Sequence, residues 1–247
     1  MDAFSISAAS GMRARLESLE MLANNLANQS SPGFKSDRET YSLYSAAEAR
    51  WPQDESAVPS PTAPVIESHW TDLRQGALRQ TGAPFDVALN GPGFFMVRSE
   101  RGELLTRNGN FRLAPTGTLE THDGYAVLDD QRRPIQISRG SSFEINQQGE
   151  LRQEGLVTGR LGIASLSKDG SFAKQAGTYF STTDTAQVLP AGAATVSQGY
   201  LENSNLAPAE GAVRLVHIMR QFESLTKAVQ IHAEMNRRSD DVARISG

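Results

Sequence analysis

The sequence predicts an α+β protein in which an N-terminal and a C-terminal helix pair as a coiled coil, with a central antiparallel all-β domain between them in the chain. At both ends of the 247-residue sequence, apolar residues recur with the three- and four-residue spacing of a coiled coil. The middle of the chain consists of short apolar runs separated by Asn-Gly and Asp-Gly dipeptides, which favour tight turns between strands. The two patterns therefore place helices at the termini and strands at the centre.

The C-terminal stretch 212–245 is the longest uninterrupted helical pattern in the chain, because it contains neither Pro nor Gly. At about 1.5 Å per residue such a helix is on the order of 50 Å long, more than a small domain needs to cover its core. Its seam, the row of side chains expected to face the N-terminal helix, consists of Leu215, Ile218, Phe222, Leu225 and Val229. A second row, on a rotated face, is interpreted as a candidate contact with neighbouring subunits and consists of Ile231, Met235, Val242 and Ile245. A helix that packs only on its own domain is the simpler alternative.

The N-terminal helix is predicted over about 4–27, within a terminal segment 1–40. It keeps the same heptad spacing, and its seam residues are Met12, Leu16, Leu19, Ala23 and Leu26. Asn24, Asn25 and Asn28 mark its end, and they are followed by Pro32 and Gly33, which cannot continue a helix. We interpret the asparagines as capping and turn residues, not as ligands.

The segment 41–69 is predicted to be a connector that separates the first helix from the β domain. Its composition is polar, and its prolines are Pro52, Pro59, Pro61 and Pro64. Prolines at this density prevent a regular helix or a central strand.

The β domain is predicted over 70–196, and a return segment with the last helix over 197–247. Turns are expected at Asn90-Gly91, Asn108-Gly109, Asp123-Gly124 and Asp169-Gly170. The clearest apolar runs between them, expected to be strands, are 85–89, 93–97, 125–128 and 135–137. Pro208 and Glu210 favour the start of the last helix, through a fixed φ and a negative charge at its positive end.

Composition narrows the class of function. A net charge of −4 gives no basic footprint for nucleic acid or an anionic membrane. The absence of cysteine excludes disulfides, thiolate metal sites and a cysteine nucleophile. The chain has no apolar run long enough to span a membrane, and its first residues lack the features of a cleaved signal peptide. We therefore expect no nucleic-acid partner, no membrane insertion, and export, if it occurs, by a route that needs no cleaved signal peptide.

No pattern in the sequence identifies a catalytic, cofactor-binding or metal site. The histidines, none of which pair at the four-residue spacing of helical metal ligands, are His69, His122, His217 and His232. Gly91-Pro92-Gly93 lacks the Gly-Lys-Ser/Thr that completes a phosphate loop. The carboxylates that could in principle supply a glycosidase pair are Asp86, Glu120, Asp123, Asp129 and Asp130, but spacing alone shows no pair. We expect a protein that is not an enzyme and needs no cofactor or metal.

Three ordered motifs resemble those of one family, the axial proteins of the bacterial flagellum, and most closely its basal-body rod proteins. The N-terminal motif is Leu22-Ala23-Asn24-Asn25-Leu26-Ala27-Asn28 followed by Gly33-Phe34-Lys35. The central motif comprises Thr81-Gly82-Ala83-Pro84-Phe85-Asp86-Val87-Ala88-Leu89, Gly91-Pro92-Gly93-Phe94-Phe95-Met96-Val97 and Thr106-Arg107-Asn108-Gly109-Asn110-Phe111. The C-terminal motif comprises Gln198-Gly199-Tyr200-Leu201-Glu202-Asn203-Ser204-Asn205, Phe222-Glu223 and Lys227-Ala228-Val229-Gln230.

The resemblance implies a subunit that polymerises with copies of itself and with other rod proteins, its paired helices forming the inner part of a tube. It also implies export through the flagellar type III apparatus, without a cleaved signal peptide, to a rod that spans the periplasm and transmits torque from motor to hook. The compact length favours a subunit of the proximal rod, and the chain most resembles the proximal-rod member of the family. A distal-rod or hook subunit and a secreted binding module that uses the β domain are the alternatives. We further hypothesise that the terminal helices become ordered only when subunits polymerise.

Overall fold

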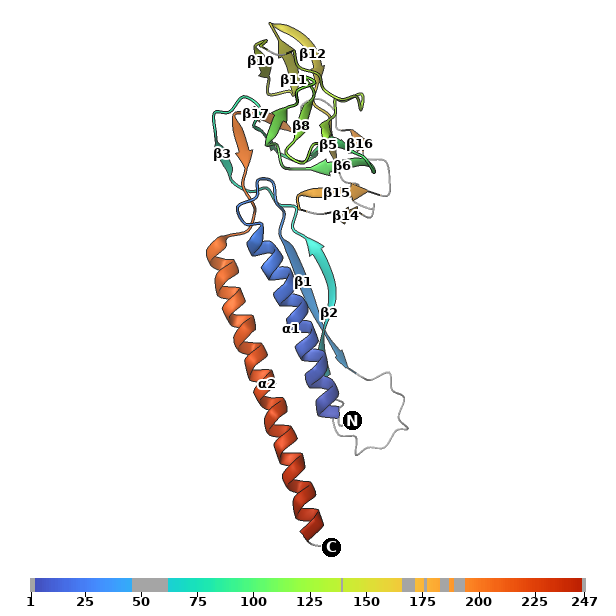
Figure 1. Ribbon diagram of the computed structural model, residues 1–247, viewed down its shortest axis with the longest axis vertical. Coiled ribbons are helices and arrows are strands. Elements are labelled where there is room, and N and C mark those ends of the chain that lie inside the picture. The colour runs from blue at the N-terminus through green and yellow to red at the C-terminus, as the bar shows by residue number, and fades with distance from the viewer. Residues whose placement is uncertain are drawn as a thin grey trace. The chain divides into compact units, whose positions relative to one another are not determined.

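The computed structural model describes residues 3–45, 62–138, 140–165, 172–175, 177–182, 187–188 and 194–245, which form two compact units (Figure 1). The helical unit comprises Met1–Ala27, Asp37–Asp72 and Ala207–Gly247, and the β unit comprises Asn28–Ser36 and Leu73–Leu206. The elements in chain order are α1 (Ala3–Ala27), β1 (Asp37–Ser45), β2 (Thr62–Thr71), β3 (Leu78–Gln80), β4 (Val87–Asn90), β5 (Phe94–Ser99), β6 (Gly102–Thr106), β7 (Phe111–Leu113), β8 (Leu119–Thr121), β9 (Ala126–Val127), β10 (Phe143–Ile145), β11 (Glu150–Gln153), β12 (Leu156–Arg160), β13 (Ile163–Ser165), β14 (Phe172–Lys174), β15 (Tyr179–Thr182), β16 (Gln187–Val188), β17 (Thr195–Gln198), β18 (Tyr200–Glu202) and α2 (Pro208–Ile245). The predicted α+β class is confirmed, and all the strand pairs described are antiparallel.

In the helical unit, α1 contacts both α2 and the hairpin formed by β1 and β2. Figure 1 shows α1 between these two neighbours, with α2 continuing past the start of α1. The helices have 25 and 38 residues, so at about 1.5 Å per residue α2 is roughly 20 Å longer. The last turns of α2 therefore extend beyond the helix on which its first half packs.

The two predicted helices are confirmed close to their expected limits. The first begins one residue before the predicted start, at Ala3, and ends at Ala27 as expected. The second begins earlier than the uninterrupted pattern, at Pro208, because a proline in the first turn has no N–H to leave unsatisfied. Glu210 lies in the same turn, where its negative charge complements the helix dipole.

The region expected to be a connector at 41–69 contains most of a β-hairpin instead. β1 and β2 pair from Asp37 opposite Thr71 to Ser45 opposite Thr62, with a register shift between Thr40 and Tyr41. Pro64 lies within β2, which is possible because both strands of a two-stranded sheet are edge strands with one side free of ladder hydrogen bonds. The other three prolines on which the expectation rested lie outside the described residues.

The β unit is organised around a nine-stranded sheet with the order β14-β15-β6-β5-β9-β8-β7, to which β13 and β16 add beside β5. A three-stranded sheet, β10-β11-β12, and two strand pairs, β17-β4 and β18-β3, complete it. Strands β17 and β18 lie in the predicted return segment, so this segment is not only a turn-prone link. It pairs with strands more than a hundred residues earlier, for example Gln198 opposite Val87.

The core of the β unit is made of alternating inward-facing side chains. Phe95 and Val97 of β5 point into one apolar cluster with Phe111, whereas Phe94 and Met96 point into a second cluster with Phe180. This alternation is the period-two pattern of a strand that is buried on both faces. Phe95 and Phe111 meet edge to face, with ring centroids 5.2 Å apart.

The predicted turns at Asn108-Gly109 and Asp123-Gly124 lie between consecutive strands, and the one at Asn90-Gly91 begins at the last residue of β4. The predicted turn at 169–170 lies outside the described residues. The run 135–137 is not a strand. It makes one isolated bridge, in which Gln136 lies opposite Thr118, and the preceding Pro134 makes another with Leu128. Pro134 cannot donate to a ladder, so continuous pairing does not extend through this run.

A glycine-to-alanine pair tests the packing of this core. A Cβ at Gly109 would lie 1.6 Å from the carbonyl oxygen of Val87, whereas one at Gly159 would make an ordinary contact 3.8 Å from the Leu151 side chain. We expect Gly109→Ala to lower the free energy of unfolding of the β unit by about 2 kcal/mol or more, because backbone must move. Gly159→Ala is expected to change it by less than about 1 kcal/mol. Urea unfolding followed by circular dichroism measures both, and equal effects would contradict this packing.

A second prediction concerns alkaline pH. Burial, together with the hydrogen bond that the Tyr179 hydroxyl donates to Asp123 Oδ2 at 2.5 Å, raises the pKa of Tyr179 above the ordinary tyrosine value of 10.0. Because the folded-state pKa is the higher one, this tyrosine contributes stability that is complete below pH 10 and declines as the pH rises above it. We expect the β unit of Tyr179→Phe to lack this part of the alkaline decline. Unfolding free energies at a series of pH values above 9, compared with the unsubstituted chain, check this.

Candidate assembly surface and the cluster that joins the motifs

A buried ion cluster in the β unit joins segments from all three sequence motifs. Lys35 follows the Gly-Phe turn, Arg107 follows β6, and Glu202 ends β18. All three side chains are almost completely buried. Lys35 Nζ donates to Glu202 Oε1 at 2.5 Å, and Arg107 Nη1 donates to Glu202 Oε2 at 3.3 Å. A single carboxylate therefore binds two cations that come from distant parts of the chain.

Backbone groups complete the cluster. Gly76 N–H donates to Glu202 Oε1 at 2.8 Å, and Gly33 N–H donates to the Glu202 carbonyl oxygen at 2.7 Å. Lys35 Nζ also donates to the Arg74 carbonyl oxygen, and Arg107 Nη2 to that of Gly91. Since a buried charge without hydrogen bonds is costly, this density of partners is what permits two cations and an anion to lie inside the fold.

Burial and the neighbouring carboxylate act in opposite directions on the pKa of Arg107. Its burial lowers the pKa of the guanidinium, and the charge of Glu202 and the hydrogen bond to it act in the opposite direction. The guanidinium carbon also lies 5.2 Å from the centroid of the Phe94 ring. Arg107 is thus held by an anion on one side and an aromatic core residue on the other.

The Gly-Phe turn fits closely against this cluster. Gly33 has a φ of +68°, and a Cβ there would lie 2.3 Å from the Arg107 carbonyl carbon. Phe34 is fully buried, and Lys174 Nζ lies 4.1 Å from its ring centroid while donating to the Lys35 carbonyl oxygen. The turn therefore needs a glycine for conformation and space, and an aromatic ring that a cation covers.

The asparagines and other motif residues have structural contacts. Asn25, in the last turn of α1, is buried and exchanges two hydrogen bonds with the backbone of Asp37, at 2.8 and 2.9 Å. Asn205 accepts from Ser36 N–H and donates to the Arg74 carbonyl oxygen. The Asn28 carbonyl oxygen and Ser204 Oγ each accept a hydrogen bond within a turn. Gly199 has a φ of +77°, and Asn24 is exposed at the end of α1.

The buried side of α1 does not coincide with the predicted seam. From residue 8 onward, where burial is described, the buried residues of α1 are Ala8, Gly11, Ala14, Ser18, Leu22 and Asn25. The predicted seam residues Met12, Leu19 and Leu26 are half-buried. Leu16 is 48% exposed and Ala23 is also exposed. In the single chain two neighbours bury α1, because both α2 and the β1–β2 hairpin contact it.

On α2, the predicted seam residues are the less exposed ones. Ile218 is buried, and Leu215, Phe222, Leu225 and Val229 are half-buried. The opposite side carries exposed apolar residues: Ile231 is 59% and Met235 is 63% exposed, and Val213 and Val216 on the same side are also exposed. The side chains of Val242 and Ile245 lie outside the part of the structure that is described.

The carboxylates considered for catalysis have structural partners. Asp86 accepts from Asn110 Nδ2, Asp123 from the Tyr179 hydroxyl, and Asp129 from Arg133. Asp130 and Glu120 form ion pairs with Arg160 and Arg112. Among the residues the structure describes, no group of three or more histidine, aspartate or glutamate side chains could hold a metal ion. Nor is any described helix sufficiently long and apolar to cross a lipid bilayer.

The ion cluster is not apparent from the sequence. Lys35, Arg107 and Glu202 each lie in one of the three sequence motifs, but no pattern there pairs them. Lys35 and Glu202 each directly follow a short run of glycine and apolar residues, which is a local signal of burial. Arg107 lies between Thr106 and Asn108 and carries no such signal. Which charges meet is a long-range property, since 167 positions separate Lys35 from Glu202.

A long helix with an exposed apolar side is typical of a protein that makes contacts with other protein chains. Comparison with known proteins agrees. Three family models match: the flagella basal body rod protein model over residues 7–35, the flagellar hook protein FlgE/F/G D1 domain over 88–153, and the flagellar basal body rod FlgEFG protein C-terminal model over 197–242.

Similar curated proteins carry the same description. The chain is 32% identical over 220 residues to flagellar basal-body rod protein FlgF of Caulobacter vibrioides, covering 89% of both chains. It is 30% identical to FlgF of Rhizobium meliloti over 84% of both chains. It is 28% identical to flagellar basal-body rod protein FlgG of Bacillus subtilis, over 92% of this chain and 93% of that protein. The chain belongs to the flagellar basal-body rod protein family, whose members are structural proteins of the flagellum and not enzymes.

Replacing Glu202 tests the ion cluster. Glu202→Gln leaves Lys35 and Arg107 buried without an anion, so we expect a loss of about 3–5 kcal/mol in the free energy of unfolding of the β unit. The matched control is Glu120→Gln, which removes the more exposed pair with Arg112 and should cost less than about 1 kcal/mol. Urea unfolding of both variants measures the difference. Similar losses for the two would mean that the buried cluster does not hold the fold together.

Proposed function

We propose that this chain is a structural subunit of the flagellar basal-body rod, which assembles with copies of itself and with other rod proteins into the drive shaft between motor and hook. The observation that carries the proposal is the 32% identity to a rod protein over 89% of both chains. The exposed apolar side of α2 supports it, because a monomer gains nothing from presenting Ile231 and Met235 to water.

Within the rod, we place the chain in the proximal part. The two FlgF relatives described above are 32% and 30% identical, and the FlgG relative is 28% identical. The difference favours the part of the rod built by FlgF, the proximal rod, over the distal rod built by FlgG. A distal-rod position is the alternative, supported by the match to FlgG over nearly its full length.

The mechanism proposed is polymerisation through the terminal helices. α1 and α2 form an intrachain coiled coil through the α2 seam, and the opposite side of α2, with Ile231, Met235, Val242 and Ile245, contacts neighbouring subunits. Such contacts join two different surfaces, and head-to-tail contacts of this kind grow a helical assembly instead of closing a dimer. Leu16 and Ala23 of α1, exposed in the single chain, are covered in the same assembly.

We further propose how the subunit is exported and when its terminal helices become ordered. The subunit reaches the periplasm through the flagellar type III export apparatus, without a cleaved signal peptide, and its terminal helices become ordered as they dock. Ordering on docking costs conformational entropy, which offsets part of the binding free energy. Circular dichroism of the purified monomer tests this step, and a monomer with both helices fully formed would contradict it.

Electron microscopy of basal bodies tests the role itself. Basal bodies are isolated from a strain that lacks this chain and from the same strain complemented with it. We expect absent or truncated rods without the chain and complete rods with it, and the stage of arrest places the subunit in the proximal or distal rod. Complete rods and normal motility without the chain would refute the rod function.

Substitutions on α2 test the polymerisation surfaces. We expect Phe222→Asp or Leu225→Asp to abolish rod assembly in the complementation strain, since a charge on the seam separates the paired helices. The β unit should keep its unfolding transition, because neither residue belongs to it. The control is Gln230→Asp, an exposed position on the same helix that lies between the seam and the opposite apolar side, and it should assemble normally. Normal rods from Phe222→Asp would show that the seam is not needed.

A further inference from the structure

We propose that the ion pair between Arg214 of α2 and Glu39 of β1 sets the rotation of the first turns of α2, and so decides which side of that helix is left for neighbouring subunits. Arg214 Nη2 donates to Glu39 Oε1 at 2.8 Å, across 175 positions of the sequence. The inference rests on the proposed function and deepens it, because it names the residues of the single chain that orient the assembly surface.

Both sides of α2 are apolar near its start, and the hydrophobic effect distinguishes them weakly there. Leu215 and Ile218 belong to the seam, whereas Val213 and Val216 lie on the opposite side and are 71% and 49% exposed. Leucine and isoleucine each have one methylene group more than valine, so the two pairs differ little in the apolar surface that α1 could cover. Selecting one side at the start of the helix therefore needs a further interaction.

Glu39 is a fixed reference for that selection. Its side chain is only 1% exposed, and it follows Asp37 by two residues in β1. The backbone of Asp37 exchanges two hydrogen bonds with the side chain of Asn25, in the last turn of α1. Thr71 Oγ1 donates to Asp37 Oδ1 at 2.7 Å, which ties β1 to β2 at the same place. The carboxylate of Glu39 therefore has a set position relative to α1, from which it can orient α2.

A half turn of α2 about its axis would separate the ion pair. With about 3.6 residues per turn, Val216 and Met219 lie about 200° and about 140° around the axis from Arg214. The half turn would withdraw the guanidinium from Glu39 and bring these apolar side chains toward a buried carboxylate. Because burying a carboxylate against apolar groups is costly, the ion pair opposes this rotation and favours the observed one.

The pair acts near the start of α2, before the turns that extend beyond α1. Arg214 lies in the second turn of the helix, which begins at Pro208. The first turns of a helix are the costly ones to form, and further residues add to them more easily. A second turn held against Glu39 gives the rest of α2 a defined rotation, so the later turns become ordered on docking with Ile231 and Met235 facing outward.

The competing interpretation is an ion pair that only stabilises the helical unit. Loss of such a pair would loosen both sides of α2 alike. Loss of an orienting pair exposes the seam and covers part of the opposite side. The two sides of the helix must therefore be followed separately.

The experiment places single cysteines in the purified full-length chain, which has none of its own. Ile218→Cys reports on the seam and Val216→Cys on the opposite side, through the rate of reaction with a small maleimide. We expect the thiol at 218 to react about tenfold slower or more than the thiol at 216, because a buried site reacts only after local opening. Adding Glu39→Leu, which replaces the carboxylate by an apolar side chain, should raise the first rate and lower the second to within about threefold of each other.

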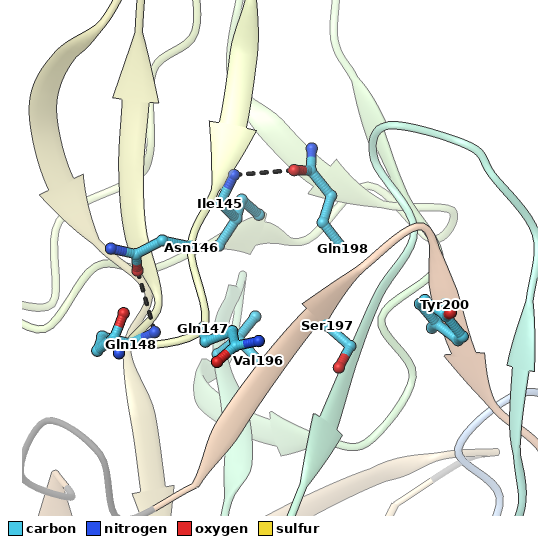
Figure 2. A pocket seen from close by; sticks show the side chains of 8 residues that line it. All are labelled: Ile145, Asn146, Gln147, Gln148, Val196, Ser197, Gln198 and Tyr200. Carbon is cyan, nitrogen blue, oxygen red and sulfur yellow. Dashed lines mark hydrogen bonds between the residues drawn. The ribbon is translucent and has the colours of Figure 1, made fainter.

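Two further variants show whether the effect belongs to the ion pair. The exchange of charges, Glu39→Arg with Arg214→Glu, should restore the original rates because it forms the pair again. The matched control is Gln198, which lines a hollow beside β10 in the β unit (Figure 2). Gln198 Oε1 accepts from Ile145 N–H at 2.9 Å, and Nε2 donates to the Pro84 carbonyl oxygen at 2.7 Å. Gln198→Ala removes these long-range bonds outside the helical unit and should leave both labelling rates unchanged.

The outcomes separate failure of this inference from failure of the rod function. Unchanged rates with Glu39→Leu, equal acceleration at both positions, or fast reaction at both positions while Glu39 is present would each overturn the inference and leave the rod function standing. Opposite changes at 216 and 218, reversed by the exchange of charges, support it. In the strain that lacks this chain, Glu39→Leu should then give fewer complete rods than the exchanged pair, and equal numbers would overturn the role of the rotation in assembly. Complete rods without any copy of the chain would overturn the rod function, whereas the labelling rates would still decide what sets the rotation.

Discussion

The β unit depends on one buried carboxylate. Glu202 binds Lys35, Arg107 and the N–H of Gly76, and these groups come from three separate segments of the chain. Each partner is buried, so the carboxylate is satisfied only when all the segments are in place, and the cations are paired only when the carboxylate is present. Folding of the segment before β1, the turn after β6 and the last strand β18 is therefore coupled.

The close approach of backbones around this cluster follows from the same requirement. The charged groups can reach Glu202 only if the chain segments that carry them come together without side chains between them. Glycines at 33 and 76 allow this, since a Cβ at either position would overlap a neighbouring backbone, that of Arg107 or that of Asn203. Phe34 then fills the space beside Lys35, and the cation of Lys174 covers its ring. The glycine, aromatic and charged residues of the motifs therefore pack together in one buried cluster.

The helical unit follows a different rule, because much of its apolar surface is left exposed. α2 is longer than the helix on which it packs, and several large apolar side chains on it face outward. In a protein that works alone such a surface promotes aggregation, and we propose that assembly with neighbouring subunits buries it here. A tightly specified β unit and an incompletely buried helical unit are consistent with a subunit whose fold is completed by its neighbours.

The sequence by itself determined where the helices lie, the family, and, except for 135–137, which of the predicted runs in the middle overlap strands. These are local signals: heptad spacing, Asn-Gly and Asp-Gly turns, and the order of short motifs. The α2 seam residues are among the less exposed residues of that helix, but their coiled-coil pairing with α1 stays a prediction. What only the tertiary structure decided is which residues meet over long distances. The prolines at 41–69 indicated a connector, yet β1 and β2 pair there because each strand supplies hydrogen bonds that a local rule does not count. The buried side of α1 differs from the predicted seam because a hairpin and a helix, not one partner, cover it. The pairing of Lys35 and Arg107 with Glu202 was invisible for the same reason, since burial makes a charge depend on its neighbours in space and not on its neighbours in the chain.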